Sequence, residues 1–184
     1  MKKNAFILAC IILLSTATID AQTIKSAVKK RPFNTASTAS VSPNAMGLVR
    51  IYNRWKKDGK TTYGINIEGS RVNATGIKPN WWSAQWTFEP VNPGQNLYRI
   101  KNRWKKDGRT DYYLHVERGR IEAGGIKPGW HSAMWRLVPV GKTGFYRIQN
   151  FWKQDQYLHI EGSRLEAGPM KPNWWSAQWR LSKN

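Results

Sequence analysis

The chain has 184 residues, which is enough for one domain with extensions but not for two domains of ordinary size. Its 30 lysines and arginines outnumber its 11 acidic residues, and the net charge of +19 predicts a salt-dependent attraction to polyanions. Cys10 is the one cysteine, which excludes an internal disulfide, and the sequence contains neither an HExxH zinc motif nor a glycine-rich phosphate loop.

The first 21 residues are typical of an export signal. Two lysines precede an apolar run from Ala5 to Leu14, and a polar stretch then ends at Ala21, after which we expect cleavage. The run is much shorter than the roughly 20 residues of a transmembrane helix, so the sequence predicts a secreted or periplasmic protein without a membrane span. A lipid anchor on Cys10 is a less favoured alternative, because the apolar run continues past that cysteine.

Residues 22–46 differ in composition from the rest of the chain. They are rich in serine, threonine and alanine, carry a basic patch at residues 29–31, and contain too few apolar residues to form a core. We therefore expect a disordered lead-in between the signal and a folded domain at residues 47–184.

The folded domain consists of three copies of one unit, at about residues 47–96, 97–144 and 145–184. Two motifs recur with variations in every copy: YRIKNRW, as the second copy has it, and KPNWWSAQW, which is identical in the first and third copies. The motifs lie at Val49–Trp55, Tyr98–Trp104 and Tyr146–Trp152, and at Lys78–Trp86, Lys127–Trp135 and Lys171–Trp179. The third copy lacks four residues after Asp155.

Each copy predicts four short strands. Apolar and polar residues alternate along the YRIKNRW motif, which is typical of a half-buried strand. In the next strand, residues 157–161, we expect Leu158 and Ile160 to point inward and His159 outward. A two-residue hairpin turn follows at Gly162. Such turns set opposite charges across from each other, in the pairs Glu68–Arg71, Glu117–Arg120 and Glu161–Arg164.

The predicted fold class is all-β, with about twelve short strands and no helical pattern. A propeller also has four strands in each blade, but it needs at least about four blades to close. An open solenoid needs capping units, which are missing here. Three hairpin units that close on a three-fold axis form a β-trefoil, and closure removes exposed sheet edges.

The chain from about Gly47 to Asn184 resembles a ricin-type (ricin B-like) β-trefoil lectin domain. The resemblance lies in the strands similar to Tyr-Arg-Ile-x-Asn and in elements similar to Gln-x-Trp, which end at Trp86, Trp135 and Trp179. It implies a shallow sugar pocket made by an aspartate on the hairpin, an aromatic residue in the following loop and polar residues beside the Gln-x-Trp tryptophan. The aspartate position here holds Asn66, His115 and His159, so galactose specificity is not implied.

The eleven tryptophans fall into three groups. Those of the Gln-x-Trp-like elements are predicted to lie in the core, and so are those that end the YRIKNRW motifs, namely Trp55, Trp104 and Trp152. The doublets in the KPNWWSAQW loops are different, because burying both members in a loop is awkward. We expect one member to pack inward and its neighbour to stay exposed.

An exposed aromatic ring beside amide side chains favours sugar recognition, because sugar C–H groups stack on the ring while amides bond the hydroxyls. We expect one weak pocket in each copy, least effective in the second copy, where Gly129, His131 and Met134 stand in place of Asn80, Trp82 and Gln85. The candidate carbohydrate-binding residues are Asn66, Asn80, Trp81, Trp82, Gln85, His115, Trp130, His131, His159, Asn173, Trp174, Trp175 and Gln178.

The sequence therefore predicts a secreted, monomeric carbohydrate-binding protein rather than an enzyme. Its acids and histidines occupy equivalent positions of the three copies, whereas a catalytic centre is one asymmetric cluster, so we expect no catalytic residue, cofactor or metal. The alternative is a polyanion-binding protein that recognises acidic polysaccharide, or less favourably nucleic acid, by charge. In that case Arg99, Lys101 and Arg103 would face outward in a basic stripe.

Overall fold

The computed structural model describes residues 46–69, 71–162 and 164–183, so the expected signal and almost all of the expected lead-in lie outside the described residues. The described chain forms twelve strands, four in each copy, which confirms the all-β prediction. They are β1 (Val49–Asn53), β2 (Tyr63–Glu68), β3 (Arg71–Gly76), β4 (Trp86–Asn92), β5 (Leu97–Asn102), β6 (Tyr113–Glu117), β7 (Arg120–Gly124), β8 (Met134–Pro139), β9 (Tyr146–Asn150), β10 (Tyr157–Glu161), β11 (Arg164–Gly168) and β12 (Trp179–Lys183).

Short 3₁₀ turns interrupt the loops that lead into the last strand of each copy. They are η2 (Trp82–Ala84), η4 (His131–Ala133) and η5 (Trp175–Ala177), and η3 (Pro93–Gln95) joins β4 to β5. Among the described residues no helix has the length and apolar character needed to cross a membrane.

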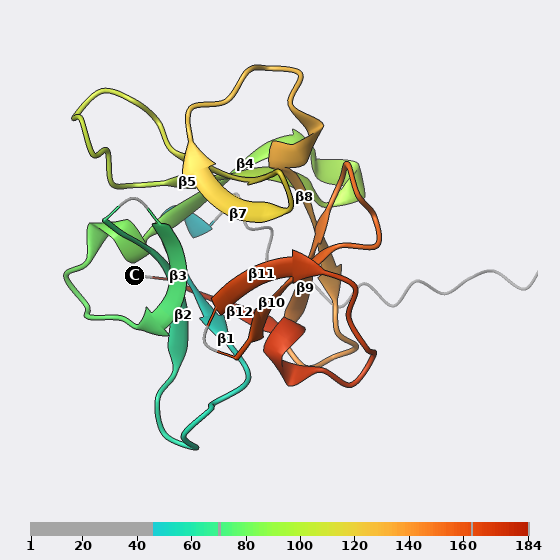
Figure 1. Cartoon of the computed structure of the whole chain (residues 1–184). Coiled ribbons are helices and arrows are strands. Elements are labelled where there is room, and N and C mark those ends of the chain that lie inside the picture. The colour runs from blue at the N-terminus through green and yellow to red at the C-terminus, as the bar shows by residue number, and fades with distance from the viewer. Residues whose placement is uncertain (1–45, 70, 163, 184) are drawn as a thin grey trace, which may run out of the picture. The chain divides into compact units, whose positions relative to one another are not determined.

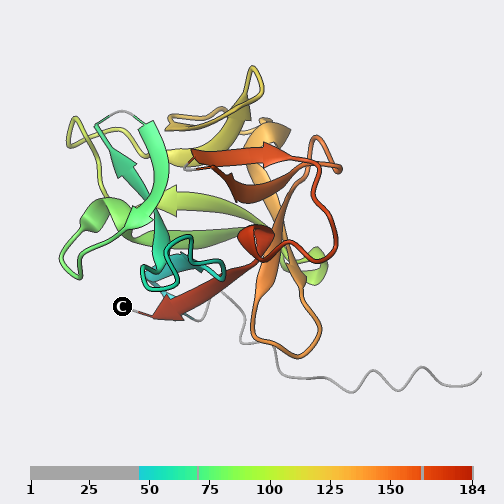
Figure 2. The ribbon, with the colours of Figure 1, turned by 60° about the horizontal axis from the view of Figure 1, so that its bottom comes forward.

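The first and last strands of the three copies pair in a closed antiparallel ring. Its order is β1, β4, β5, β8, β9 and β12, and β12 pairs back onto β1 from Val49↔Lys183 to Asn53↔Trp179. The middle strands form three hairpins, β2–β3, β6–β7 and β10–β11, whose second strands contact one another (Figures 1 and 2). This ring with three hairpins is the β-trefoil that the repeats predict.

The core is organised by one tryptophan from each copy. Trp86, Trp135 and Trp179 are completely buried, as predicted. Each donates its indole N–H to a backbone carbonyl oxygen in the second strand of its own copy, at 2.7–2.8 Å, and the acceptors are Ile65, Leu114 and Leu158. A buried indole needs such a partner, so these bonds hold each hairpin to the ring.

The hairpin register also agrees with the sequence analysis. The turns set Glu68 opposite Arg71, Glu117 opposite Arg120 and Glu161 opposite Arg164. Each hairpin tip therefore carries one glutamate and one arginine side by side, next to the turn.

Candidate functional site

Three pockets lie at equivalent positions of the three copies. The first, second and third pockets have volumes of about 360, 380 and 440 Å³, respectively. In each, one wall is the hairpin tip, a second is the doublet loop of the same copy, and the third is a tryptophan from the next copy around the ring. The shared positions are Glu68, Trp81, Trp82 and Trp104 in the first pocket, Glu117, Trp130, His131 and Trp152 in the second, and Glu161, Trp174, Trp175 and Trp55 in the third.

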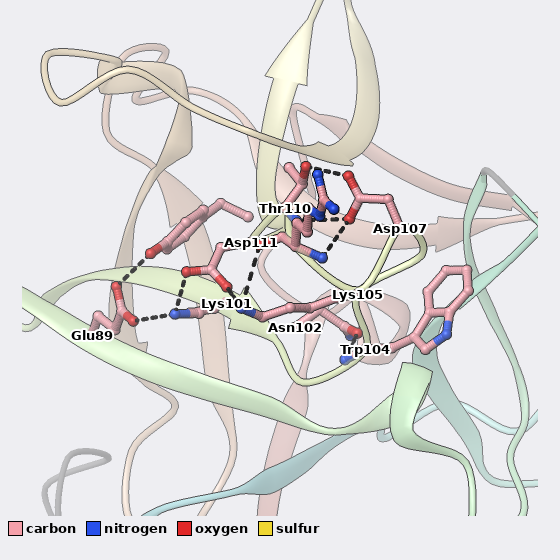
Figure 3. Close-up of polar contacts among 10 residues, drawn as sticks. Glu89, Lys101, Asn102, Trp104, Lys105, Asp107, Thr110 and Asp111 are labelled. Carbon is pink, nitrogen blue, oxygen red and sulfur yellow. Dashed lines mark hydrogen bonds and ion pairs between the residues drawn. The ribbon is translucent and has the colours of Figure 1, made fainter.

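A buried asparagine places the third wall of each pocket. Asn102 is 1% exposed, donates from Nδ2 to the Ser83 carbonyl oxygen at 2.9 Å, and accepts the backbone N–H of Trp104 at 2.8 Å (Figure 3). The same bonds join Asn150 to Ser132 and Trp152, and Asn53 to Ser176 and Trp55. Each pocket is therefore built across two copies, and the first copy completes the third pocket.

The prediction that Trp55, Trp104 and Trp152 belong to the core is wrong for Trp152 and only partly right for the other two. Trp55 and Trp104 are half-buried, and each stacks on a tyrosine of its own copy, Tyr63 and Tyr112, with ring centroids 6.5 and 6.3 Å apart. The shorter loop of the third copy puts Gln156 at that place, so Trp152 has no such partner and is 57% exposed.

The doublet loops of the first and third copies expose one member and keep the other half-buried, as predicted, and the exposed member is the second one. Trp82 and Trp175 are 56% and 55% exposed, whereas Trp81 and Trp174 are half-buried. Backbone hydrogen bonds hold the first loop in shape, because the Trp81 carbonyl oxygen accepts the N–H of Ala84 at 3.2 Å and the Trp82 carbonyl oxygen accepts that of Gln85 at 3.0 Å. The exposed rings are therefore presented by a folded loop.

The residues at the aspartate position of the resemblance are buried, which corrects the expectation that His159 points outward. Asn66, His115 and His159 are 0%, 4% and 3% exposed. His159 lies against the Trp174 ring at 5.6 Å, and its Nδ1 is 3.0 Å from the Tyr157 carbonyl oxygen, so this nitrogen carries the proton. Half-buried Trp174 covers this face of the strand. The alternation of residues along the strand alone could not predict that a loop tryptophan would bury this face.

The same histidines come close to carboxylates. In the second copy the ligand atoms of His115, Glu117 and Glu122 lie within 4.8 Å of one another, as do those of His159, Glu161 and Glu166 in the third. His Nε2 faces the first glutamate at 3.7 and 3.5 Å, respectively. One nitrogen and two carboxylates are a donor set that a divalent cation such as zinc accepts. A protonated histidine would form an ion pair in the same geometry.

Gln85 and Gln178 are also buried, at 3% and 4% exposed, so their predicted sugar contact is corrected. Each amide oxygen accepts a hydrogen bond from an arginine of the next copy, Arg103 at 2.6 Å and Arg54 at 2.7 Å. These guanidinium groups lie over the Trp82 and Trp175 rings, 4.2 and 4.6 Å from the centroids. The glutamines thus hold arginines that lie over the exposed tryptophan rings.

The second copy replaces this whole arrangement. Phe151 stands in place of the arginine, Met134 in place of the glutamine and His131 in place of the tryptophan, and His131 meets the Phe151 ring edge-on at 5.5 Å. The second copy therefore lacks the hydrogen-bonded arginine and glutamine that accompany the exposed tryptophan in the other two copies.

The predicted outward basic stripe is not free. Arg50, Arg99 and Arg147 are half-buried and donate to the carbonyl oxygens of Pro79, Pro128 and Pro172, respectively. Lys101 lies 2.7 Å from Asp111, which raises the pKa of Lys101 (Figure 3). The pKa of Asp111 is lowered by its hydrogen bonds to Lys101 and Lys105. These four side chains therefore have partners inside the protein, although the buried Nε atoms of the three arginines have none.

The pockets contain eight of the predicted site residues and two groups that the sequence analysis assigned elsewhere. The predicted residues that line them are Asn80, Trp81, Trp82, Trp130, His131, Asn173, Trp174 and Trp175. The glutamates of the hairpin tips were interpreted only as cross-strand partners, and the tryptophans of the YRIKNRW motifs as core. Their position in the sequence could have indicated the glutamates as pocket residues, since each stands two residues after the aspartate position and next to the turn.

No model of a known protein family matches the chain, and no curated protein matches it. Several solved structures, however, match it. A GlcNAcα1-4Gal-releasing endo-β-galactosidase from Clostridium perfringens is 29% identical over 75% of this chain and 33% of its own, with a TM-score of 0.61. SeviL bound to asialo-GM1 saccharide is 20% identical, over 75% of this chain and 98% of its own, with a TM-score of 0.57.

A designed three-fold symmetric protein, ThreeFoil, matches 75% of this chain with 99% of its own, at 16% identity and a TM-score of 0.59. The chain spans about a third of the endo-β-galactosidase but nearly all of SeviL and ThreeFoil. With its closed ring, three hairpins and three repeated tryptophan elements, the described chain has the ricin B-like β-trefoil lectin fold.

Proposed function

We propose that this protein is an exported lectin that binds carbohydrate, without cleaving it, in three pockets on one rigid body. The observation that carries the proposal is the threefold recurrence of one pocket with an exposed aromatic wall and a carboxylate beside it. Lectin structures among its neighbours support the assignment, and one of them is described with a bound saccharide.

The chemistry of each pocket suits a sugar. The exposed faces of Trp82 and Trp175 offer flat apolar surface for sugar C–H groups, and Glu68 and Glu161 offer two acceptor oxygens each for hydroxyl groups. Volumes of about 360–440 Å³ lie at the lower end of the range for small-molecule pockets, which fits a sugar or two. Three weak pockets on one body gain avidity for a polymeric glycan.

The number of carboxylates in each pocket supports binding without cleavage. Glycoside hydrolysis normally needs a pair of them on either side of the scissile bond. The described lining of each pocket contains one, namely Glu68, Glu117 or Glu161. The match covers 33% of the endo-β-galactosidase, so the activity named for that whole protein is not carried over to this chain.

Export remains part of the proposal. The apolar run at residues 5–14 supports passage through a membrane and release, with a mature chain that begins at Gln22. N-terminal sequencing of the exported protein tests it, and a retained leader in the exported material would contradict it.

A first experiment replaces Trp82 and Trp175 with alanine, singly and together. A glycan array read at low and high salt first identifies a bound glycan. We expect each single change to lower affinity for that glycan by roughly two- to tenfold, the loss of an aromatic contact worth about 0.5–1.5 kcal/mol. The double variant should lose far more on a polymeric glycan, because avidity is lost.

Val91→Ala is the matched control, since Val91 is an exposed apolar residue outside the three pockets. Each variant must retain the parental melting temperature. A folded double variant that binds like the parent would show that these loops are structural. Binding that depends on salt alone, and not on the tryptophans, would support the polyanion alternative.

A further inference from the structure

The second pocket differs from the others at its hairpin tip. Arg118 occupies the turn position that Gly69 and Gly162 occupy in the other copies. Its φ is +49°, and those of the two glycines are +63° and +62°. A residue with a side chain is strained in this left-handed region, whereas glycine is not. The second hairpin therefore has an arginine at a turn position where the other two hairpins have glycine, the residue that this backbone conformation favours.

Strained backbone conformations cluster at functional sites, so an observed one supports a functional hypothesis. Arg118 is exposed and lines the second pocket together with Trp130, His131 and Trp152. Beside the first and third pockets an arginine lies over the tryptophan ring and is bonded to a buried glutamine, and it does not line the pocket. In the second pocket that arginine is replaced by Phe151, and the cationic group is on the opposite wall, facing the pocket.

The charges around the second pocket include one opposing group. Glu117 also lines it, but Glu117 stands opposite Arg120 in the hairpin. On the other wall, Lys153 Nζ lies over the Trp152 ring, 4.9 Å from its centroid. The described hairpin residues that line the first and third pockets include Glu68 and Glu161 but no cation.

We infer that the second pocket binds an acidic sugar, with a carboxylate or sulfate on Arg118 and the sugar face on an aromatic wall, while the other two pockets take neutral sugars. A guanidinium group matches the planar oxygens of a carboxylate or sulfate with paired hydrogen bonds. This inference rests on the proposed carbohydrate function. It also replaces the expectation that the second pocket is the least effective one.

The test is Arg118→Gly, which copies the turn of the other two copies. The probes are a uronic-acid disaccharide, its sulfated form, and the same disaccharide with the carboxyl group reduced to an alcohol. At physiological salt we expect affinity for the two acidic probes to fall at least about tenfold, because the variant loses a charged hydrogen-bonded pair. Affinity for the neutral probe should stay unchanged, and the melting temperature should be equal or higher.

Lys142→Gly is the matched control, because it removes the same charge from the loop between β8 and β9, outside the pockets. A gain-of-function variant adds Gly162→Arg to Arg118→Gly. Gly162 has the same left-handed backbone and open space around an added Cβ, so this variant should restore acidic-sugar binding at the third pocket.

Unchanged binding of acidic probes by Arg118→Gly, or an equal loss in Lys142→Gly, would overturn the inference. If neutral glycans still bind through Trp82 and Trp175 in that case, the proposed function stands and only the acidic specificity fails. If the parent protein binds neither acidic nor neutral probes, and no glycan on the array, both fail.

Discussion

Arginines in this protein have different roles according to their nearest partner. Arg147 donates to the Pro172 carbonyl oxygen, Arg103 bonds Gln85 and supports Trp82, and Arg118 faces a pocket. The net charge of +19 therefore does not describe a uniform basic surface. Sequence patterns assign these side chains only to a strand face or a turn, because their partners come from loops 18 to 25 residues away.

Hydrogen bonding also sets the charge state of two loop aspartates. Asp107 accepts the Thr110 hydroxyl and the backbone N–H groups of Thr110 and Arg109, which lowers its pKa to about 2 from 3.8 (Figure 3). Asp58 has the same contacts with Thr61 and Lys60, and the same pKa of about 2. Because the folded-state pKa is the lower one, this stabilisation is complete above about pH 4 and is lost as the pH falls through about 2.

Thr110→Val should raise the pKa of Asp107 toward 3.8, because the hydroxyl group is its strongest hydrogen-bond donor. The measurement is an NMR pH titration of the aspartate carboxyl carbons. Asp58, whose threonine is untouched, is the internal control and should keep its pKa of about 2. An Asp107 pKa that does not move in the variant would show that the backbone N–H groups alone determine it.

At the scale of elements, the sequence predicted the strands, the hairpin register and the exposure of one member of each doublet. These follow from local alternation and turn chemistry. It did not predict which elements form the walls of each pocket. Those walls depend on a buried asparagine that donates a hydrogen bond to the preceding copy. Asn102 reaches Ser83 across 19 residues, but Asn53 reaches Ser176 across 123.

Asn102→Ala should destabilise the protein and loosen the first pocket together. The change leaves the Ser83 carbonyl oxygen and the Trp104 N–H without their partner, at a cost on the order of 2 kcal/mol in the free energy of unfolding. Urea unfolding measures this, and glycan binding at the first pocket should weaken. Asn92→Ala, at an exposed asparagine without a capping bond, should change stability by less than about 0.5 kcal/mol. Equal effects of the two changes would contradict the role of Asn102.

The whole trefoil unit depends on closure of the ring by β1 and β12, which are at opposite ends of the described strands. Three equivalent tryptophans hold the hairpins to this ring through the same hydrogen bond. No copy has a separate core, because the buried apolar residues of all three copies form one cluster. We therefore expect the unit to unfold in a single transition.

Trp86→Phe, Trp135→Phe and Trp179→Phe should each lower the free energy of unfolding by a similar amount, roughly 2–4 kcal/mol, since each loses one buried hydrogen bond and leaves a small cavity. Chemical denaturation followed by circular dichroism and by tryptophan fluorescence measures both the loss and the cooperativity. A variant in which one copy unfolds before the others, seen as two transitions, would contradict the single core.

The sequence by itself determined the three copies, the twelve strands, closure into a trefoil and the three core tryptophans. Each of these depends on residue spacing within one copy and on its repetition. The tertiary structure alone decided that Gln178 holds Arg54 over the Trp175 ring and that Trp55 completes the pocket of the third copy. The physical reason is that these contacts join copies whose chain positions are far apart, so their geometry exists only once β12 has paired with β1.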